Sequence, residues 1–259
     1  MDGSVKARVC NELQLAHALL EQFLGVQFHA PEPYIGSEHQ GRFMQISSMK
    51  DIARAAMVQG AYDDEINGIF VPDQLALHEE NAAERIFVFI HECGHALSVQ
   101  QNPKLKQTKV TRLMQSKTRR IREKGYVSVA FEEGLATHLA IQACLGSGRT
   151  DLVAYAGRVH KKLVDFFVEW ISPSERNFAL MAKVCKADPH DWQKVIGWYF
   201  GGDSMEVGLE YYKYDIGYYF IRTLKPDTQM ILQMIQQPPS TVQHILYPEI
   251  YRSEKLVRN

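Results

Sequence analysis

The spacing of apolar residues predicts that the chain begins with an amphipathic helix. Between residues 9 and 24, large apolar side chains fall roughly at helical intervals, which places them on one face of a helix. The members of that face are Val9, Leu13, Leu20, Phe23 and Leu24. A stretch rich in proline and glycine follows at 29–41, and we expect it to form a loop.

Short strand-like patterns come next. Residues 42–48 ("RFMQISS") and 67–71 ("NGIFV") are typical of strands, and Pro72 marks the end of the second one or an edge position. The residues between them, 49–60, have a helical pattern that ends near Gly60. This part of the chain therefore predicts a small sheet accompanied by helices.

The strongest helical pattern covers residues 79–103, "EENAAERIFVFIHECGHALSVQQNP". Apolar residues surround its middle, which predicts a central and buried helix. Asn81 is the expected N-cap, because Glu84 follows three residues later in a capping-box arrangement. Pro103 marks the expected end of the helix.

The remainder of the chain is mainly helical in pattern. Residues 126–148 begin with strand-like residues, become helical, and are closed by Gly146 and Gly148. From about residue 150 onward the apolar spacing stays helical. We therefore predict an α+β fold, with a small N-terminal mixed sheet plus helices over about 1–103 and a mainly helical part over about 125–259.

The composition is that of an ordinary globular protein. Of the 259 residues, 46% are hydrophobic and 23% are charged, and the net charge of −1 argues against polyanion binding by the whole surface. The four cysteines are scattered without a CxxC pair, which favours a reducing compartment. No signal peptide or transmembrane run is evident, so we expect a cytoplasmic protein or one exported without such a signal.

The near-neutral total hides a basic segment at 104–124. This segment holds nine Lys or Arg residues and one Glu, which leaves 20 basic and 29 acidic residues for the rest of the chain. It is interpreted either as a solvated surface or as a docking patch for an acidic protein, a phosphoinositide membrane or a nucleic acid. The run contains no aromatic residue, which weakens nucleic-acid recognition by base stacking.

The segment "FVFIHECGHAL" carries the candidate chemistry. His91 and His95 are four residues apart, so a helix would place both imidazoles on one face, where they can bind a single Zn²⁺. Glu92 lies about 100° around the helix from His91, which suits a general base acting on a zinc-bound water. The other interpretation is a pair of buried core histidines. Cys93 is interpreted as a small buried hydrophobe.

A third metal ligand has to come from elsewhere in the chain. Ser98 and Gln101 occupy the positions where a metzincin would have Gly and His, so that pattern fails. The downstream stretch "AFEEGLATHLA" resembles the gluzincin group of zinc metallopeptidases, in which a later helix supplies a glutamate ligand. The matching residue is Glu133, which is separated from His95 by 37 residues. Glu132 and His138 remain alternatives for this role or for orienting the ligands.

Two further features match the same family. The stretch "YYKYDIGYYFIRTL" resembles the gluzincin helix that carries an oxyanion-stabilising residue, which implies that role for Tyr214, with Gly217 allowing close helix packing. Tyr211 and Tyr218 compete with Tyr214, and plain aromatic packing is the alternative. The strand at 67–71 also stands where zincins have the antiparallel edge strand that pairs with a peptide substrate.

The resemblance implies a single zincin-like metallopeptidase domain over residues 1–259. In it, His91, His95 and Glu133 hold Zn²⁺, Glu92 is the base and Tyr214 assists, and the substrate is a peptide or protein. No signature for binding a free amino terminus is evident, which favours an endopeptidase. The alternatives are a zincin-fold binding or scaffold protein with a non-catalytic zinc, a zinc hydrolase acting on something other than a peptide, and a helical interaction module that uses residues 104–124.

Overall fold

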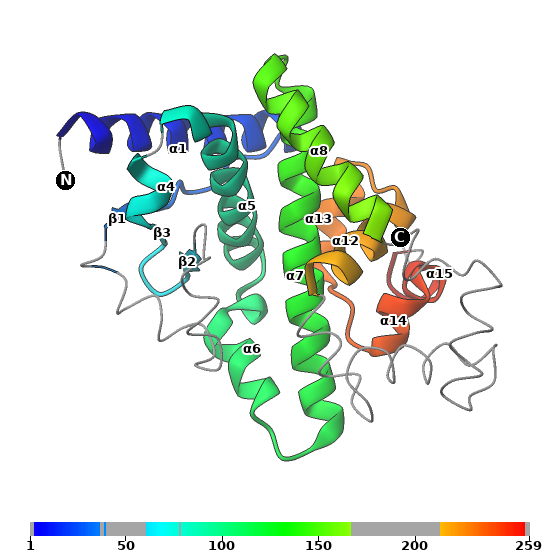
Figure 1. Ribbon diagram of the computed structural model, residues 1–259. Helices are drawn as coiled ribbons and strands as arrows, with labels where there is room; N and C mark the ends of the chain where they lie inside the picture. The colour runs from blue at the N-terminus through cyan, green and yellow to red at the C-terminus, as the bar shows by residue number, and fades with distance from the viewer. Residues whose placement is uncertain (1–2, 37–38, 40–60, 78, 167–212, 257–259) are drawn as a thin grey trace. The chain divides into compact units, whose positions relative to one another are not determined.

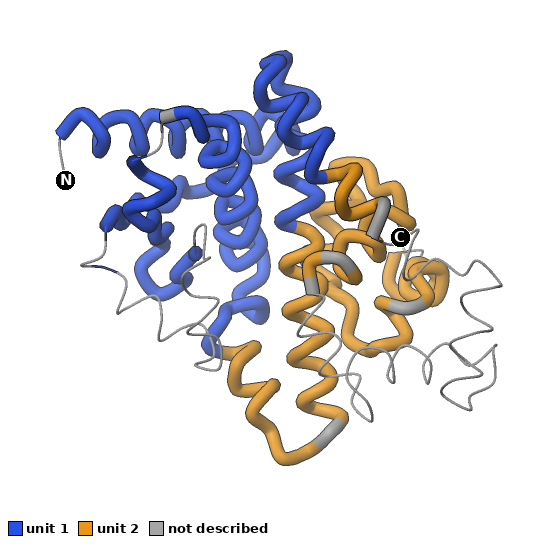
Figure 2. Tube along the Cα trace, viewed as in Figure 1, with its two compact units in different colours: residues 1–108, 136–159 blue, residues 109–135, 160–259 orange. Residues whose placement is uncertain are grey.

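The computed structural model describes residues 3–36, 39, 61–77, 79–166 and 213–256 (Figure 1). It divides into unit 1, which comprises residues 1–108 and 136–159, and unit 2, which comprises residues 109–135 and 160–259 (Figure 2). Two helices, α7 (Arg119–Gly146) and α8 (Thr150–Phe166), run continuously from one unit into the other.

Several expected elements lie outside the described residues, among them the strand at 42–48 and the helix at 49–60. The single domain that we predicted over residues 1–259 stays a prediction.

A three-stranded mixed sheet lies in unit 1, as predicted. Its strands are β1 (Glu32–Ile35), β2 (Ala61–Asp63) and β3 (Gly68–Val71), in the order β1-β3-β2. Strand β3 pairs in parallel with β1 and antiparallel with β2. The expectation that residues 67–71 form an edge strand is therefore wrong, because β3 is hydrogen-bonded on both sides. All four of its residues are buried, as the middle strand of a covered sheet requires.

Strand β1 falls in the stretch that we expected to be a loop. Its prolines suggested a break in regular structure, and Pro33 has no N–H to give to a ladder. Proline is tolerated in an edge strand, and β1 is an edge strand of this sheet, with Pro33 paired to Ile69 of β3. The pairing joins residues far apart in the sequence, which local patterns do not reveal.

The helices of unit 1 pack around α5, the helix that carries the two histidines. The predicted N-terminal helix is confirmed as α1, which contacts α5, and Val9, Leu13, Leu20 and Leu24 are buried in it. The helical elements of this part are α1 (Gly3–Leu24), α4 (Asp73–Leu77), the 3₁₀ turn η3 (Glu79–Asn81), α5 (Ala82–Gln101) and the 3₁₀ turn η4 (Pro103–Leu105).

A buried ion pair fastens α1 to α5. Arg85 is fully buried, and its guanidinium donates to both carboxylate oxygens of Glu12, at 2.7 and 2.9 Å. A third donor of the same guanidinium reaches the Leu75 carbonyl at 3.3 Å, so α4 is held as well. Because two of its bonds are bidentate and charge-assisted, this arginine is well satisfied despite its burial.

The two ends of α5 differ in how well the sequence predicts them. The helix begins after Asn81 as expected, but the Asn81 side chain makes no capping hydrogen bond. An N-cap needs extended backbone, and Asn81 instead ends the 3₁₀ turn η3 with φ −97° and ψ 23°. The C-terminal end is confirmed, because Asn102 is extended before Pro103, which disfavours helical backbone in the preceding residue.

In the part of unit 2 that the structure describes, the regular elements are all helical. Its core brings together rings from α7, α12 and α15, with Phe220 in edge contact with Phe131 and Tyr251. Its elements besides α7 and α8 are α6 (Gln107–Met114, entering from unit 1), α12 (Lys213–Leu224), α13 (Thr228–Gln236), α14 (Val242–Leu246), α15 (Pro248–Tyr251) and the π-helical turn η6 (Arg252–Leu256).

The strand-like start expected near residue 126 is wrong, because α7 is helical from Arg119 to Gly146. Val127, Ala130 and Phe131 are fully buried, and their spacing of three and four residues suits one face of a helix. Tertiary packing of that face outweighs the strand propensity of the local sequence.

Helices α7 and α12 meet at a pair of glycines, which confirms the expectation for Gly217. A Cβ atom added to Gly217 would collide with the carbonyl of Ala130, and one added to Gly134 would collide with the backbone of Gly217. The two helices can approach this closely only because neither residue has a side chain. Gly134 directly follows Glu133, so this crossing also restrains the turn of α7 that carries Glu133.

The described residues thus show a small N-terminal mixed sheet followed by a mainly helical part, in agreement with the coarse fold class. Cys10, Cys93 and Cys144 are free thiols. Among the described residues, we find no helix with the length and apolar character needed to cross a bilayer.

The glycine crossing makes a direct prediction about stability. We expect Gly134→Ala to lower the free energy of unfolding by about 1–3 kcal/mol, because the new methyl group would force α12 away from α7. Gly157→Ala is the matched control, since nothing lies within 4 Å of the added methyl in α8, and it should raise that free energy by about 0.5–1 kcal/mol. Urea unfolding followed by circular dichroism measures both, and equal effects of the two substitutions would refute the crossing.

Candidate metal centre

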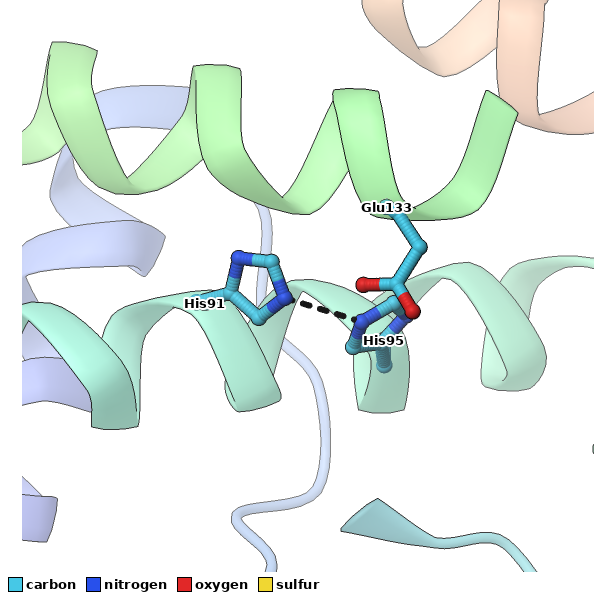
Figure 3. Close-up of side chains that lie close together, drawn as sticks. All are labelled: His91, His95 and Glu133. Atoms are coloured by element: carbon cyan, nitrogen blue, oxygen red, sulfur yellow. Dashed lines mark hydrogen bonds between the residues drawn. The ribbon is translucent and has the colours of Figure 1, made fainter. Parts of the chain in front are cut away.

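Helix α5 presents the two histidines of the HExxH motif side by side. His91 and His95 are one turn apart, and their Nε2 atoms face each other at 3.2 Å (Figure 3). Both side chains are half-buried, while Glu92, Cys93 and Gly94 between them are buried. The two imidazoles are therefore more accessible than the three residues between them.

The third member of the group is Glu133 of α7. One ligand atom from each of His91, His95 and Glu133 lies within 4.8 Å of the others, and all three side chains are half-buried. Figure 3 shows the Glu133 carboxylate directed from α7 toward the His95 ring. These three side chains could together hold a metal ion.

The alternatives for the third ligand are not part of this group. Glu132 precedes Glu133 on α7 but is buried, with 7% of its surface exposed. His138 is buried to the same extent. Neither belongs to the set of described His, Cys, Asp and Glu residues whose ligand atoms converge. Two adjacent residues of α7 therefore differ, because the Glu133 carboxylate lies near the two histidines while the Glu132 carboxylate is buried.

A close approach of α5 and α7 brings these ligands together. A Cβ atom added to Gly94 would lie 3.1 Å from the Cα of Ala136, which is tighter than an ordinary contact. Gly94 directly precedes His95, and Ala136 lies three residues after Glu133. The small residues at this crossing let the two backbones come near enough for a short Glu side chain to reach an imidazole.

A second residue of α7 contacts His91 directly. The Thr137 hydroxyl lies 3.4 Å from His91 Nδ1, the ring nitrogen that does not face His95. If Nε2 binds a metal, Nδ1 carries the proton and donates to the hydroxyl, which fixes both the tautomer and the ring orientation. Sequence reasoning missed Thr137. Its position four residues after Glu133, on the same helical face, was the available signal.

The donor set fits zinc. Two nitrogens bound to one tetrahedral Zn²⁺ at its usual bond length lie about 3.3 Å apart, close to the separation of the two Nε2 atoms. Imidazole nitrogens and one carboxylate are common zinc ligands, whereas Mg²⁺ and Ca²⁺ prefer all-oxygen sites. Three protein ligands also leave a fourth position for a small molecule, which is typical of catalytic rather than structural zinc sites.

Glu92 and Cys93, the two residues that follow His91, are both buried but differ in their chemistry. Glu92 is 8% exposed and belongs to the same helical turn as His91 without joining the ligand group. Cys93 is fully buried, and burial followed by the charge of Glu92 raises the pKa of its thiol. A thiol that resists ionisation is a poor metal ligand and nucleophile, which agrees with its interpretation as a small buried hydrophobe.

The tyrosines of α12 are arranged differently from one another. Tyr218 is 2% exposed, and its hydroxyl lies 2.5 Å from His160 Nδ1, so it is part of the packing between α8 and α12 in unit 2. Burial raises the pKa of Tyr218 to about 12. Tyr214 is 43% exposed near the start of α12, and its predicted role stays a prediction. Tyr211 lies outside the described residues.

Comparison of the chain with known proteins finds no matching family model, no similar curated protein and no similar solved structure.

Zinc affinity tests whether Glu133 or its neighbour Glu132 is the third ligand. We expect Glu133→Gln to weaken zinc binding by at least about 100-fold, because the neutral amide is a poor replacement for a carboxylate ligand. Glu132→Gln is the matched control, and it should leave the affinity within about twofold. Competition against a chromophoric chelator measures both constants, and the reverse ranking would move the ligand to Glu132.

The contact between Thr137 and His91 can be tested with two substitutions at one position. Thr137→Val removes the hydroxyl at nearly constant shape, and we expect about tenfold weaker zinc binding with the metal-free stability little changed. Thr137→Ser restores the hydroxyl and should restore the affinity. If valine and serine behave alike in the same titration, Thr137 does not position His91.

Proposed function

We propose that this protein is a zinc-dependent peptidase of the gluzincin type. The observation that carries the proposal is the convergence of His91, His95 and Glu133, in which the two histidines share one helix with a buried glutamate between them. This is the arrangement that the HExxH motif and the downstream glutamate predict together. Their agreement supports catalysis, because a purely structural zinc site has no use for Glu92.

Peptide hydrolysis needs a nucleophilic water, stabilisation of charge on the carbonyl oxygen, and a proton for the departing amine. When bound, zinc acts as a Lewis acid that acidifies water and polarises the carbonyl. The Glu92 carboxylate would accept the proton of the attacking water and deliver it to the leaving nitrogen. A hydrogen bond from the Tyr214 hydroxyl to the oxyanion would add to this stabilisation.

The accessibility of the three ligands favours this proposal over a scaffold with a non-catalytic zinc. Structural zinc sites are closed by four protein ligands and shielded from solvent. In the part of the chain that the structure describes, the ligand group has three members and each is half-buried. A half-exposed site with a free coordination position can receive both a water molecule and a substrate carbonyl.

The decisive variant is Glu92→Gln. This variant should still bind zinc, because Glu92 is not in the ligand group. Its rate of hydrolysis should fall by about 100-fold or more, because the amide cannot accept a proton. The substrate is found in the same experiment, by mass spectrometry of the new protein termini that the wild-type protein creates in a proteome extract. Glu84→Gln, about two turns earlier on α5, is the control and should create the same termini as the wild type.

Two results would contradict the proposal. One is a set of termini that Glu92→Gln creates as fast as the wild type. The other is the absence of any new terminus from a wild-type sample that binds one equivalent of zinc, which would leave the metal-binding scaffold as the better account.

A further inference from the structure

Residues 109–124 of the basic segment form a helical hairpin in unit 2, made of α6 from Lys109, a short turn, and the start of α7 up to Lys124 (Figure 1). Apolar side chains hold its two arms together. Val110 is 1% exposed, and a Cβ atom added to Gly125 of α7 would press on Leu113 and Met114 of α6. The inner face of the hairpin is therefore used for packing.

Exposed cations lie along both arms and the turn of this hairpin, and we call them its basic face. Lys109 and Arg112 are exposed on α6, Lys117 is exposed in the turn, and Arg120 and Lys124 are exposed on α7. Within each helix these residues are three or four positions apart, so like charges are neighbours on one side, which is unfavourable for an isolated helix. Residues 109–124 include a single acidic residue, Glu123.

The turn between the arms is well defined. The Arg122 guanidinium donates to the carbonyls of Ser116 and Lys117, both at 3.1 Å, and the Ser116 hydroxyl accepts from the N–H of Thr118 at 3.2 Å. Arg122 thus stabilises the turn, and the exposed side chains of Lys117 and Arg120 are attached to a backbone that is already ordered. A preformed surface loses less entropy on binding than a flexible tail.

We propose that the exposed basic face of residues 109–124 is a docking surface for an acidic segment of a polypeptide substrate. The inference rests on the proposed function, since it concerns how a peptidase would select its substrate. Charge complementarity carries it, because the hairpin gathers cations on a chain whose remainder is acidic.

The same surface fits other anionic partners less well. Base stacking needs aromatic side chains, and residues 109–124 contain none. Helices that insert into a membrane surface combine basic residues with several apolar anchors, whereas Ile121, 41% exposed, is the one large apolar residue that is exposed in the described hairpin. An acidic polypeptide needs neither feature, only the row of cations.

The geometry of α7 links docking to cleavage. Lys124 lies nine residues before Glu133 on the same continuous helix, which corresponds to about 14 Å along its axis. An extended polypeptide covers this distance with about four residues. We therefore expect an acidic segment to promote cleavage when at least about four residues separate it from the cleaved bond, and to lose that effect when the separation is shorter.

Docking is tested apart from cleavage with the Glu92→Gln protein, which holds zinc but should not cut. The probe is a fluorescent peptide with a run of glutamates, and its anisotropy is followed from about 50 to 300 mM salt. We expect saturable binding that weakens steeply with salt. The hairpin variant should weaken it by about tenfold or more and flatten the salt dependence; its substitutions are Arg112→Gln, Lys117→Gln, Arg120→Gln and Lys124→Gln.

A matched variant removes the same number of exposed positive charges elsewhere, with Lys6→Gln, Lys161→Gln, Lys162→Gln and Lys225→Gln. It should bind the acidic peptide as the parent does. Equal weakening by both variants would show a general charge effect and overturn the proposal. Tighter binding to vesicles containing phosphatidylserine, or to single-stranded DNA, than to the peptide would overturn it as well.

Cleavage by the wild-type protein then separates this inference from the proposed function. If peptides are cut but the hairpin variant cuts acidic and neutral ones at unchanged relative rates, the docking surface is wrong and the peptidase stands. If the acidic peptide binds at the hairpin and no peptide is cut, the surface remains a site for acidic polypeptides and the peptidase is wrong.

Discussion

The candidate site depends on how closely α7 can approach α5. Where the two helices meet, Gly94 offers no side chain and Ala136 offers only a methyl group, and even an added Cβ at Gly94 would be crowded. A larger residue in either place would push the two backbones apart and draw the Glu133 carboxylate away from the histidines. The convergence of Glu133 with His91 and His95, and the contact of Thr137 with His91, both follow from this one crossing.

Small residues have a second use on the same helix. Gly134 packs against Gly217 of α12, so the turn that holds Glu133 is restrained within unit 2 as well as through Ala136 within unit 1. Between these contacts the side chain of Glu133 stays half-exposed, while Glu132 beside it is buried. Packing thus selects which of two adjacent carboxylates can serve a metal.

Features set by local chemistry could be predicted from the sequence, and features set by distant pairing could not. The four-residue spacing of His91 and His95 requires only a helix, and Pro103 ends that helix through its effect on Asn102. The central place of β3 and the existence of β1 depend on pairing between segments that are more than thirty residues apart in the sequence. The contact of Thr137 with His91 likewise joins residues that are 46 positions apart. The missing Asn81 cap has a local cause, because a 3₁₀ turn precedes the helix and removes the extended backbone that a cap needs.

The central claim is that three side chains, and not four, hold one zinc ion. X-ray absorption at the zinc edge of the purified protein tests this most directly. The account predicts two imidazoles at about 2.0–2.1 Å and oxygen from one carboxylate and one solvent molecule, with the carboxylate contribution lost in Glu133→Gln. A sulfur neighbour at about 2.3 Å, or an unchanged spectrum in that variant, would contradict it.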